Sequence, residues 1–289
     1  MSTPTLFQYP FTPKTLRIQG HALSYLDEGR GLPLVMVHGN PSWSYLYRNL
    51  VRELRRRHRC IAPDHMGCGL SAKPANYPYR LRRHIDNLEH LLDHLKVERC
   101  VLMVHDWGGA IGMGWAIRHP ERINGLVVFN TAAFPADQIP LRINICRLPL
   151  LGALMIRGFN GFARAAVHMA VRRKMSPRVA AGFLYPYDSW KNRVALHAFV
   201  RDIPMKKNHP SRLTLEEVAD GLHRLRDKPM LICWGGDDFC FTDSFLNQWQ
   251  QRFPAAESHY LARAGHYVLE DALPEILHHL HPFLAACHD

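Results

Sequence analysis

The hydrophobic residues of the chain fall into two kinds of segment that alternate along it. Short apolar runs without polar alternation, such as 33–37 and 100–104, are typical of parallel strands buried on both faces. Between such runs, residues 43–57, 80–95 and 108–119 carry apolar side chains three or four positions apart, and this spacing predicts amphipathic helices. The alternation predicts an α/β fold in which helices cover both faces of a mostly parallel sheet.

The same pattern predicts eight strands in the sheet. The first two, at 15–20 and 21–29, form a pair around a turn at Gly20. A final helix is predicted over 272–286. The other six strands are predicted at 33–39, 59–64, 100–106, 125–130, 228–238 and 258–267.

A helical insertion interrupts the strand pattern in the second half of the chain. Helical segments rich in apolar and basic residues replace the strands there, and the strands return later. We therefore predict a core of residues 1–130 and 216–289, with residues 131–215 inserted as a helical cap over the strand ends. Thr214 and Glu217 have the spacing of a capping box, which predicts the start of the helix that leads back to the core.

Length and composition fit an ordinary globular protein. The chain has 289 residues, of which 47% are hydrophobic and 21% charged. It has no run of about 18 apolar residues, and its N-terminus lacks the basic start and apolar stretch of a signal peptide. The seven cysteines are odd in number and lack C-x-x-C spacing, which indicates reduced thiols. We therefore expect a cytoplasmic protein without a transmembrane segment.

The chain is strongly basic. Lysine and arginine outnumber acidic residues by 36 to 25, giving a net charge of +11. The surplus is concentrated in RELRRRHR (52–59), YRLRRH (79–84) and VRRK (171–174). Such a surface can attract nucleic acid, anionic lipid or an acidic partner. Because the runs follow amphipathic patterns without a nucleic-acid-binding motif, we interpret them as solvated helix faces and expect no nucleic-acid partner.

Polar residues follow four of the predicted strands at their carboxyl ends, where open α/β sheets form their sites. They are His38-Gly39-Asn40-Pro41, Asp106-Trp107, Asp238 and His266. Asp106 stands at a strand-to-helix turn before two glycines, which is the arrangement of a nucleophile elbow, and the chain order of nucleophile, acid and histidine also matches that fold. Taken alone, Asp106 could be a helix N-cap and Asp238 a turn residue.

An aspartate nucleophile suits alkyl halides, epoxides and strained rings, because attack by its carboxylate produces an ester with the enzyme. Water activated by His266 can then attack that ester while an aspartate holds the imidazole in the required tautomer; Asp238 is our choice for this role and Asp237 its competitor. Trp107 and Asn40 can direct an indole and an amide N–H at a developing anion. Histidine and carboxylate pairs at metal-ligand spacing are missing from these strand ends, so we expect neither a metal nor an organic cofactor.

Four motifs resemble the haloalkane-dehalogenase branch of the α/β-hydrolase fold, and the resemblance extends over nearly the whole chain. They are VHGNPSWSYLYRNL, PDHMGCGLS, VHDWGGAIGMGWAI, and WGGDDFCF followed later by GHYVLED. The resemblance implies that Asp106 is the nucleophile and His266 the base. It implies that Asn40 and Trp107 bind the leaving group.

The resemblance also favours one of the two adjacent aspartates as the acid. Asp238 lies three residues beyond the glycine of the WG pair, where members of this branch carry it. Some members place the acid after the preceding strand instead, but that strand ends in Asn130 here. Val104 stands where serine hydrolases have the first glycine of the elbow, and dehalogenase-like members share this departure.

Within this branch, NTAAFP, YPYDSWKNR, RDIPM and DDFCFTDSFL resemble the β-lactone decarboxylases of bacterial long-chain olefin biosynthesis. This resemblance implies conversion of a cis-3,4-dialkyl-oxetan-2-one into a cis-alkene and CO2. The apolar cap suits a hydrophobic substrate with two alkyl chains. Whether Asp106 attacks the carbonyl or a ring carbon stays open, and because the reaction consumes no net water, so does the role of His266.

Three other functions are alternatives at this point. A haloalkane dehalogenase, which hydrolyses alkyl halides to alcohol and halide, fits the same residues, and an apolar cap also suits a bromoalkane. An epoxide hydrolase needs two cap tyrosines, for which Tyr185 and Tyr187 are available, but Asn40 and Trp107 suit an anion better. A non-enzymatic binding module is the least favoured, because all three catalytic positions are filled.

The resemblance to olefin-pathway enzymes also implies partners. It implies assembly with the synthetase that makes the β-lactone and with the thiolase-like and reductase enzymes that act before it. The basic clusters offer a surface for such docking or for peripheral contact with a membrane.

Overall fold

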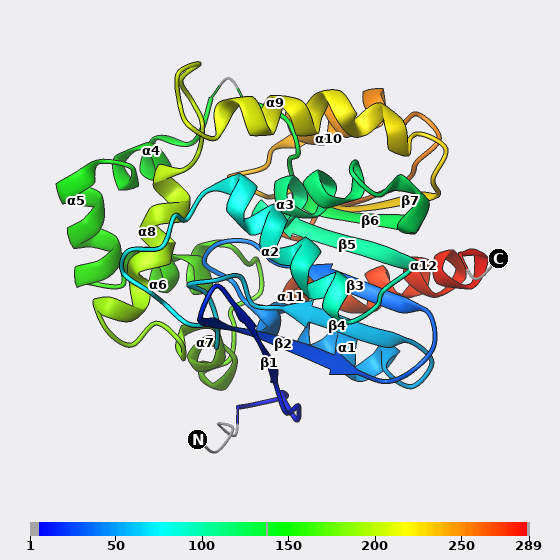
Figure 1. Cartoon of the computed structure of the whole chain (residues 1–289), viewed down its shortest axis with the longest axis horizontal. Helices are drawn as coiled ribbons and strands as arrows, with labels where there is room; N and C mark the ends of the chain where they lie inside the picture. Colours follow the sequence, from blue (N-terminus) through cyan, green and yellow to red (C-terminus); the bar gives the residue numbers. More distant parts are fainter. Residues whose placement is uncertain (1–5, 137, 288–289) are drawn as a thin grey trace.

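A computed structural model describes residues 6–136 and 138–287; the ends of the predicted core, 1–5 and 288–289, lie outside these described residues. Its eight strands form one sheet in the order β1-β2-β4-β3-β5-β6-β7-β8 (Figure 1). The predicted α/β class and number of strands are therefore confirmed. The strands are β1 (Lys14–Ile18), β2 (His21–Glu28), β3 (Pro33–Val37), β4 (Arg59–Pro63), β5 (Cys100–Asp106), β6 (Ile123–Thr131), β7 (Met230–Gly235) and β8 (Glu257–Leu261).

The sheet is parallel except at one edge. β1 pairs antiparallel with β2, and β2 pairs antiparallel with β4, whereas every pair from β4 to β8 is parallel. The tight β1–β2 connection passes through Gly20 at φ +80°, a conformation that glycine adopts without strain. The parallel strands bring the carboxyl ends of β3, β5, β6, β7 and β8 to one edge of the sheet.

Helices cover both faces of the sheet and enclose two separate hydrophobic cores. On one face lie α1 (Arg48–Leu54), α11 (Val268–Asp271) and α12 (Leu273–Ala286). On the other lie α2 (Leu81–His94), α3 (Trp107–Ala116) and α10 (Asp243–Arg252). Figure 1 shows α2 and α3 in front of the sheet and α11 and α12 behind it.

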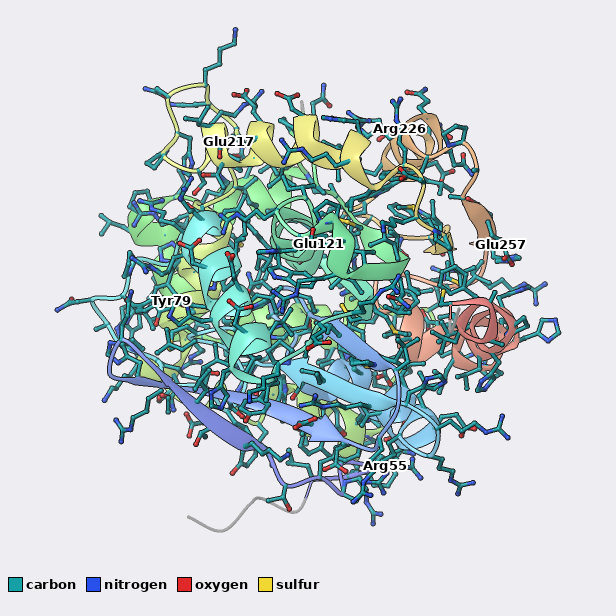
Figure 2. The ribbon with its side chains drawn as sticks, turned by 45° about the vertical axis from the view of Figure 1, so that its right-hand side comes forward. Arg55, Tyr79, Glu121, Glu217, Arg226 and Glu257 are labelled. Carbon is teal, nitrogen blue, oxygen red and sulfur yellow. The ribbon has the colours of Figure 1, made fainter. Side chains whose placement is uncertain are left out.

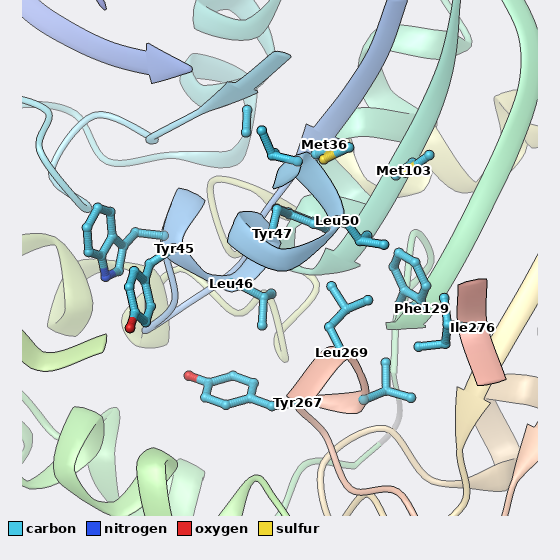
Figure 3. Close-up of a cluster of buried hydrophobic side chains, with 14 of the residues drawn as sticks. Met36, Tyr45, Leu46, Tyr47, Leu50, Met103, Phe129, Tyr267, Leu269 and Ile276 are labelled. Atoms are coloured by element: carbon cyan, nitrogen blue, oxygen red, sulfur yellow. The ribbon is translucent and has the colours of Figure 1, made fainter. Parts of the chain in front are cut away.

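The side chains of β5 show why its sequence lacks polar alternation. Val101 and Met103 face the first core, together with Leu50 of α1 and Ile276 of α12 (Figure 3). Cys100, Leu102 and Val104 of the strand face the second core. All seven residues of β5 are buried, as expected for a central parallel strand.

Among its described residues, the segment between β6 and β7 contains helices and loops but no strand. Figure 1 shows α4 to α8 at one end of the molecule, beyond the sheet. α9 packs against α2 and α3 of the core and spans the predicted boundary between residues 215 and 216. The helices are α4 (Leu141–Cys146), α5 (Pro149–Ala153), the π-helix η3 (Leu154–Gly158), α6 (Gly161–Met169), α7 (Pro177–Leu184), η4 (Lys191–Arg193), α8 (Val194–Arg201), α9 (Arg212–Gly221) and η5 (Leu222–Leu225).

The predicted capping box at the start of α9 is wrong. The helix already begins at Arg212, so Thr214 and Glu217 lie inside it. Ser211, directly before the helix, donates its hydroxyl to the buried carboxylate of Asp202 at 2.7 Å. This contact lies at the start of the helix, and the spacing of residues along the sequence did not indicate it.

None of the helices in the described part of the chain is long and apolar enough to cross a membrane.

Close backbone packing at the site edge gives a first testable prediction. A Cβ on Gly108 would lie 1.9 Å from the carbonyl oxygen of Val37, so Gly108→Ala must displace α3 from the sheet. We expect the free energy of unfolding to fall by about 2 kcal/mol or more and Tm to fall by roughly 4 °C or more. Gly158→Ala is the control, because its Cβ would approach the flexible end of Leu154 most closely, at 3.2 Å. Equal Tm values for the two variants in thermal unfolding would contradict the packing argument.

Candidate active site

Asp106 occupies a sharp turn between the end of β5 and the start of α3. Its backbone lies at φ 52° and ψ −126°, a region that non-glycine residues rarely occupy and that commonly marks a functional site. The hydroxyl of Thr131, at the end of β6, donates to the carbonyl oxygen of Asp106 and holds this turn. The side chain of Asp106 therefore points into the space at the carboxyl edge of the sheet.

Backbone amides hold the carboxylate of Asp106. The N–H of Asn40, after β3, donates to Oδ1 at 2.6 Å, and the N–H of Trp107 contributes a second hydrogen bond. Burial raises the pKa of Asp106, and the nearby imidazole of His266 and these two hydrogen bonds oppose the rise. Because Oδ1 accepts from Asn40, Oδ2 is the oxygen that faces His266.

His266 lies between two carboxylates. Its Nδ1 is 2.8 Å from Oδ2 of Asp238, and its Nε2 is 3.8 Å from Oδ2 of Asp106. Burial favours the neutral imidazole, but the charge and hydrogen bond of Asp238, together with Asp106, outweigh burial and raise the pKa of His266. The three side chains are buried and could act as nucleophile, histidine and acid.

The two adjacent aspartates after β7 have different surroundings. Asp238 is buried and uses its other oxygen, Oδ1, to accept the N–H of Cys240 at 2.6 Å. Asp237 has a side chain that is 46% exposed and forms an ion pair with Arg172 at 2.6 Å. Asn130 exchanges two hydrogen bonds with the backbone of Gly235, so it joins β6 to β7. Of these side chains, Asp238 is the one in contact with His266.

Two buried residues that we did not single out in the sequence hold the loop of His266. The Nε2–H of His105 donates to the carbonyl oxygen of His266 at 2.8 Å, and burial lowers the pKa of His105 well below its usual value. Asp271 accepts the N–H of Gly265 at 2.9 Å and those of Arg172 and Arg173 at 2.8 and 2.9 Å. The residues before α7 are thereby tied to the loop. In the sequence, the only indication of a role for His105 and Asp271 was that they lie close to Asp106 and His266 in the motifs.

Asn40 and Trp107 lie on the wall of the same cavity. The amide of Asn40 donates one N–H to the carbonyl oxygen of Leu196 at 3.2 Å, which leaves one N–H for a substrate. Among the described residues, the indole N–H of Trp107 has no hydrogen-bond partner, and its ring packs edge-on against Phe199 at 5.4 Å. A free donor beside Asp106 suits an anion that develops there.

A mostly apolar cavity of about 510 Å³ lies above Asp106. Its polar groups include Asn40, Asp106, Arg142 and His266. Tyr185 and Tyr187 are not among its described lining residues: Tyr185 is 46% exposed, and the buried hydroxyl of Tyr187 donates to Ser42. The apolar lining includes Ala110, Phe134, Ile139, Ile143, Met155, Phe162, Met169, Val200, Leu215, Phe239, Phe241 and Phe245.

One group of three side chains in the described chain could hold a metal ion, and it lies outside the cavity. Glu257 and His259 of β8 and His279 of α12 place their ligand atoms within 4.8 Å of one another. The ring of His259 stacks on that of His279 with 3.4 Å between centroids. This group has no contact with Asp106 or His266 that would link it to the cavity chemistry.

Comparison with known proteins places this site in a family. A family model described as alpha/beta hydrolase fold matches residues 33–145. A curated cis-3-alkyl-4-alkyloxetan-2-one decarboxylase from Shewanella oneidensis is 47% identical, over 95% of this chain and 89% of its own.

Haloalkane dehalogenases are more distant relatives. Haloalkane dehalogenase 2 from Mycobacterium bovis is 31% identical, over 93% of this chain and 94% of its own. The crystal structure of the haloalkane dehalogenase DatA from Agrobacterium tumefaciens superposes with a TM-score of 0.86 at 25% identity, over 96% of this chain and 97% of that one. The chain belongs to the α/β-hydrolase-fold family, in the branch that contains the haloalkane dehalogenases and the cis-3-alkyl-4-alkyloxetan-2-one decarboxylases.

Proposed function

We propose that the protein is a β-lactone decarboxylase that converts a cis-3,4-dialkyl-oxetan-2-one into a cis-alkene and CO2. The observation that carries this proposal is the 47% identity, over nearly the full chain, to a curated enzyme with that name. The site supports it, because a buried carboxylate nucleophile opens into an apolar cavity large enough for alkyl chains.

We infer that Asp106 attacks ring carbon C4 of the lactone. Its Oδ2 forms a bond to C4, the ring C4–O bond breaks, and the departing oxygen becomes part of a substrate carboxylate. The bond from C3 to that carboxylate then breaks, and its electron pair forms the alkene. The C4–O bond to Asp106 breaks in the same step, which releases CO2 and the free aspartate.

This route uses no water and no net proton, whereas attack on the carbonyl would leave an alkoxide that must later depart. It also explains the geometry of the product. Attack from behind C4 places the oxygen of Asp106 opposite the substrate carboxylate while both alkyl chains stay on one side. Elimination from that arrangement gives the cis-alkene. An apolar cavity favours the second step, because it destabilises the carboxylate relative to neutral CO2.

In this mechanism His266 acts as a cation. With its pKa raised by the flanking carboxylates, the imidazolium stabilises Asp106 as a carboxylate when the ester bond breaks. Asp238 holds the ring and its charge through the 2.8 Å hydrogen bond to Nδ1. Trp107 and the remaining N–H of Asn40 bind the substrate carboxylate as it forms.

Haloalkane dehalogenation is the second candidate. The unpaired indole N–H of Trp107 beside Asp106 favours it, since a neutral donor there suits a halide. It requires His266 as a neutral base that activates water against the alkyl-enzyme ester. The positions of Tyr185 and Tyr187 give no support to epoxide hydrolysis, because neither reaches the cavity.

We further propose that a β-lactone synthetase supplies the substrate within an assembly that includes the other enzymes of the olefin pathway. The chemistry supports a coupled supplier, because a strained lactone reacts with water when it is free.

Seven free thiols support the reducing cytoplasm as the compartment.

Product analysis tests the two candidate reactions directly. Given a cis-3,4-dialkyl-β-lactone and, separately, 1-bromohexane, the wild-type protein is expected to form alkene by gas chromatography and little bromide by ion assay. Asp106→Asn is expected to lose alkene formation by about 10³-fold or more, with unchanged circular dichroism. Bromide without alkene, abolished in Trp107→Leu, would replace the decarboxylase with the dehalogenase.

The adjacent aspartates provide a matched pair of variants. Asp238→Asn removes the charge that faces Nδ1 of His266, so we expect kcat for alkene formation to fall by about 10²-fold or more. Asp237→Asn removes an exposed ion pair and should leave kcat within about twofold. Steady-state kinetics on the same lactone measures both. Equal losses in the two variants would show that the hydrogen bond from His266 to Asp238 has no catalytic role.

The pH profile separates the two roles of His266. If the imidazolium acts, kcat for alkene formation falls as pH rises through the pKa of His266, which lies above 6.5. It also falls as pH drops through the pKa of Asp106, above 3.8, because the protonated carboxyl is not a nucleophile. Alkene formation that instead increases through the pKa of His266 would show that neutral histidine acts as a base.

A further inference from the structure

Part of the predicted cap carries charge of one sign. Residues 138–187 contain eight arginine and lysine residues and no aspartate or glutamate. In the described chain, Arg172 alone among the eight forms an ion pair, with Asp237 outside this stretch. The eight are Arg142, Arg147, Arg157, Arg164, Arg172, Arg173, Lys174 and Arg178.

The same stretch of the chain exposes large apolar side chains. Leu150 of α5 is 87% exposed, and Leu154 and Phe159 at the two ends of η3 are 50% and 67% exposed. α4 and α5 lie at the end of the molecule farthest from α12 (Figure 1). We call the outward side of residues 138–187 the cap face; its exposed apolar residues are Leu141, Leu148, Leu150, Leu151, Leu154 and Phe159.

Acidic side chains are found on other parts of the surface. Glu121, Glu217 and Glu257, labelled in Figure 2, belong to η2 (Pro120–Arg122), α9 and β8. The mixed charge there is typical of a surface that faces water. Apolar side chains among unpaired cations are instead typical of segments that lie in a lipid interface.

The cap face and the cavity share their helices. Arg142 and Ile143 of α4, Met155 of η3, and Phe162 and Met169 of α6 line the cavity. Neighbouring residues of the same helices point outward, including Leu141 and Leu154. A molecule held at the cap face is therefore separated from the cavity by a single layer of helices.

We propose that the cap face binds the surface of an anionic phospholipid membrane. Its leucines and phenylalanine enter the boundary of the acyl chains, and its arginines and lysine contact the lipid phosphates, as in interfacial helices. A second copy of the chain is a poor occupant, because a symmetric contact would bring two positive faces together.

Membrane binding also has a consequence for the substrate, and this part rests on the proposed function. A lactone with two alkyl chains partitions into lipid rather than water. From a membrane, the lactone enters the cavity past α4, η3 and α6 without passing through water. Turnover of a lactone held in vesicles therefore depends on the cap face, whereas turnover of a short, water-soluble lactone does not.

Vesicle sedimentation with the whole chain, without substrate, tests the binding itself. We expect the wild type to bind phosphatidylglycerol-containing vesicles and to bind pure phosphatidylcholine vesicles at least about tenfold less, with binding weakened by salt. Leu150→Ser with Leu154→Ser is expected to reduce binding about tenfold. Arg164→Glu with Lys174→Glu is expected to do the same.

Variants elsewhere on the surface provide the controls. Arg56→Glu with Arg226→Glu makes the same change in net charge outside the cap face, and Tyr260→Ser removes an exposed aromatic side chain from β8. Both should bind vesicles like the wild type. If the control and cap-face variants lose vesicle binding equally, net charge alone explains the binding, and the proposal is overturned.

Two other outcomes would also overturn it. Absence of vesicle binding together with a dimer in light scattering that Leu150→Ser dissolves would make a second copy the occupant. Absence of vesicle binding together with a stable complex of the cap face with a purified β-lactone synthetase would make a protein the occupant. Sedimentation measures vesicle binding and needs no turnover. Vesicle binding can therefore be absent while the protein converts the lactone, and it can be present while conversion is absent.

Discussion

The turn at Asp106 is the constraint on which the rest of the site depends. Its φ of 52° is sterically costly, and the surrounding structure maintains it through close approach at Gly39 and Gly108. A Cβ on Gly39 would lie 1.9 Å from the carboxylate of Asp106, and one on Gly108 would lie 1.9 Å from Val37. The absence of two side chains therefore allows β5, β3 and α3 to meet and to direct one carboxylate into the cavity.

The buried charges of the site stabilise one another. Asp106 and Asp238 lie on opposite sides of His266, and their charges raise the pKa of the imidazole although burial opposes its charged form. Burial raises the pKa of Asp106, while His266 and two backbone hydrogen bonds favour its carboxylate in the apolar cavity.

Between β6 and β7 the chain forms helices that contribute to two surfaces. The inner side of α4, η3 and α6 lines the cavity, while the outer side carries leucines and arginines. The sheet below contributes Asn40, Asp106, Asp238 and His266 from four strand ends. A rigid sheet can hold these groups in place while the helices above it set which molecules reach them.

The sequence alone determined the class of fold, the eight strands and the identity of the candidate groups, because buried parallel strands and strand-end motifs are local patterns. Its choice of Asp238 over Asp237 rested on the family resemblance, because the two residues are adjacent in the chain and differ in burial and partners only after folding. It missed His105 and Asp271, because their contacts join residues far apart in the chain, and it misplaced the start of α9, where Ser211 contacts the buried Asp202. The tertiary structure decided these features, since burial and long-range hydrogen bonds exist only once the strands and helices have packed.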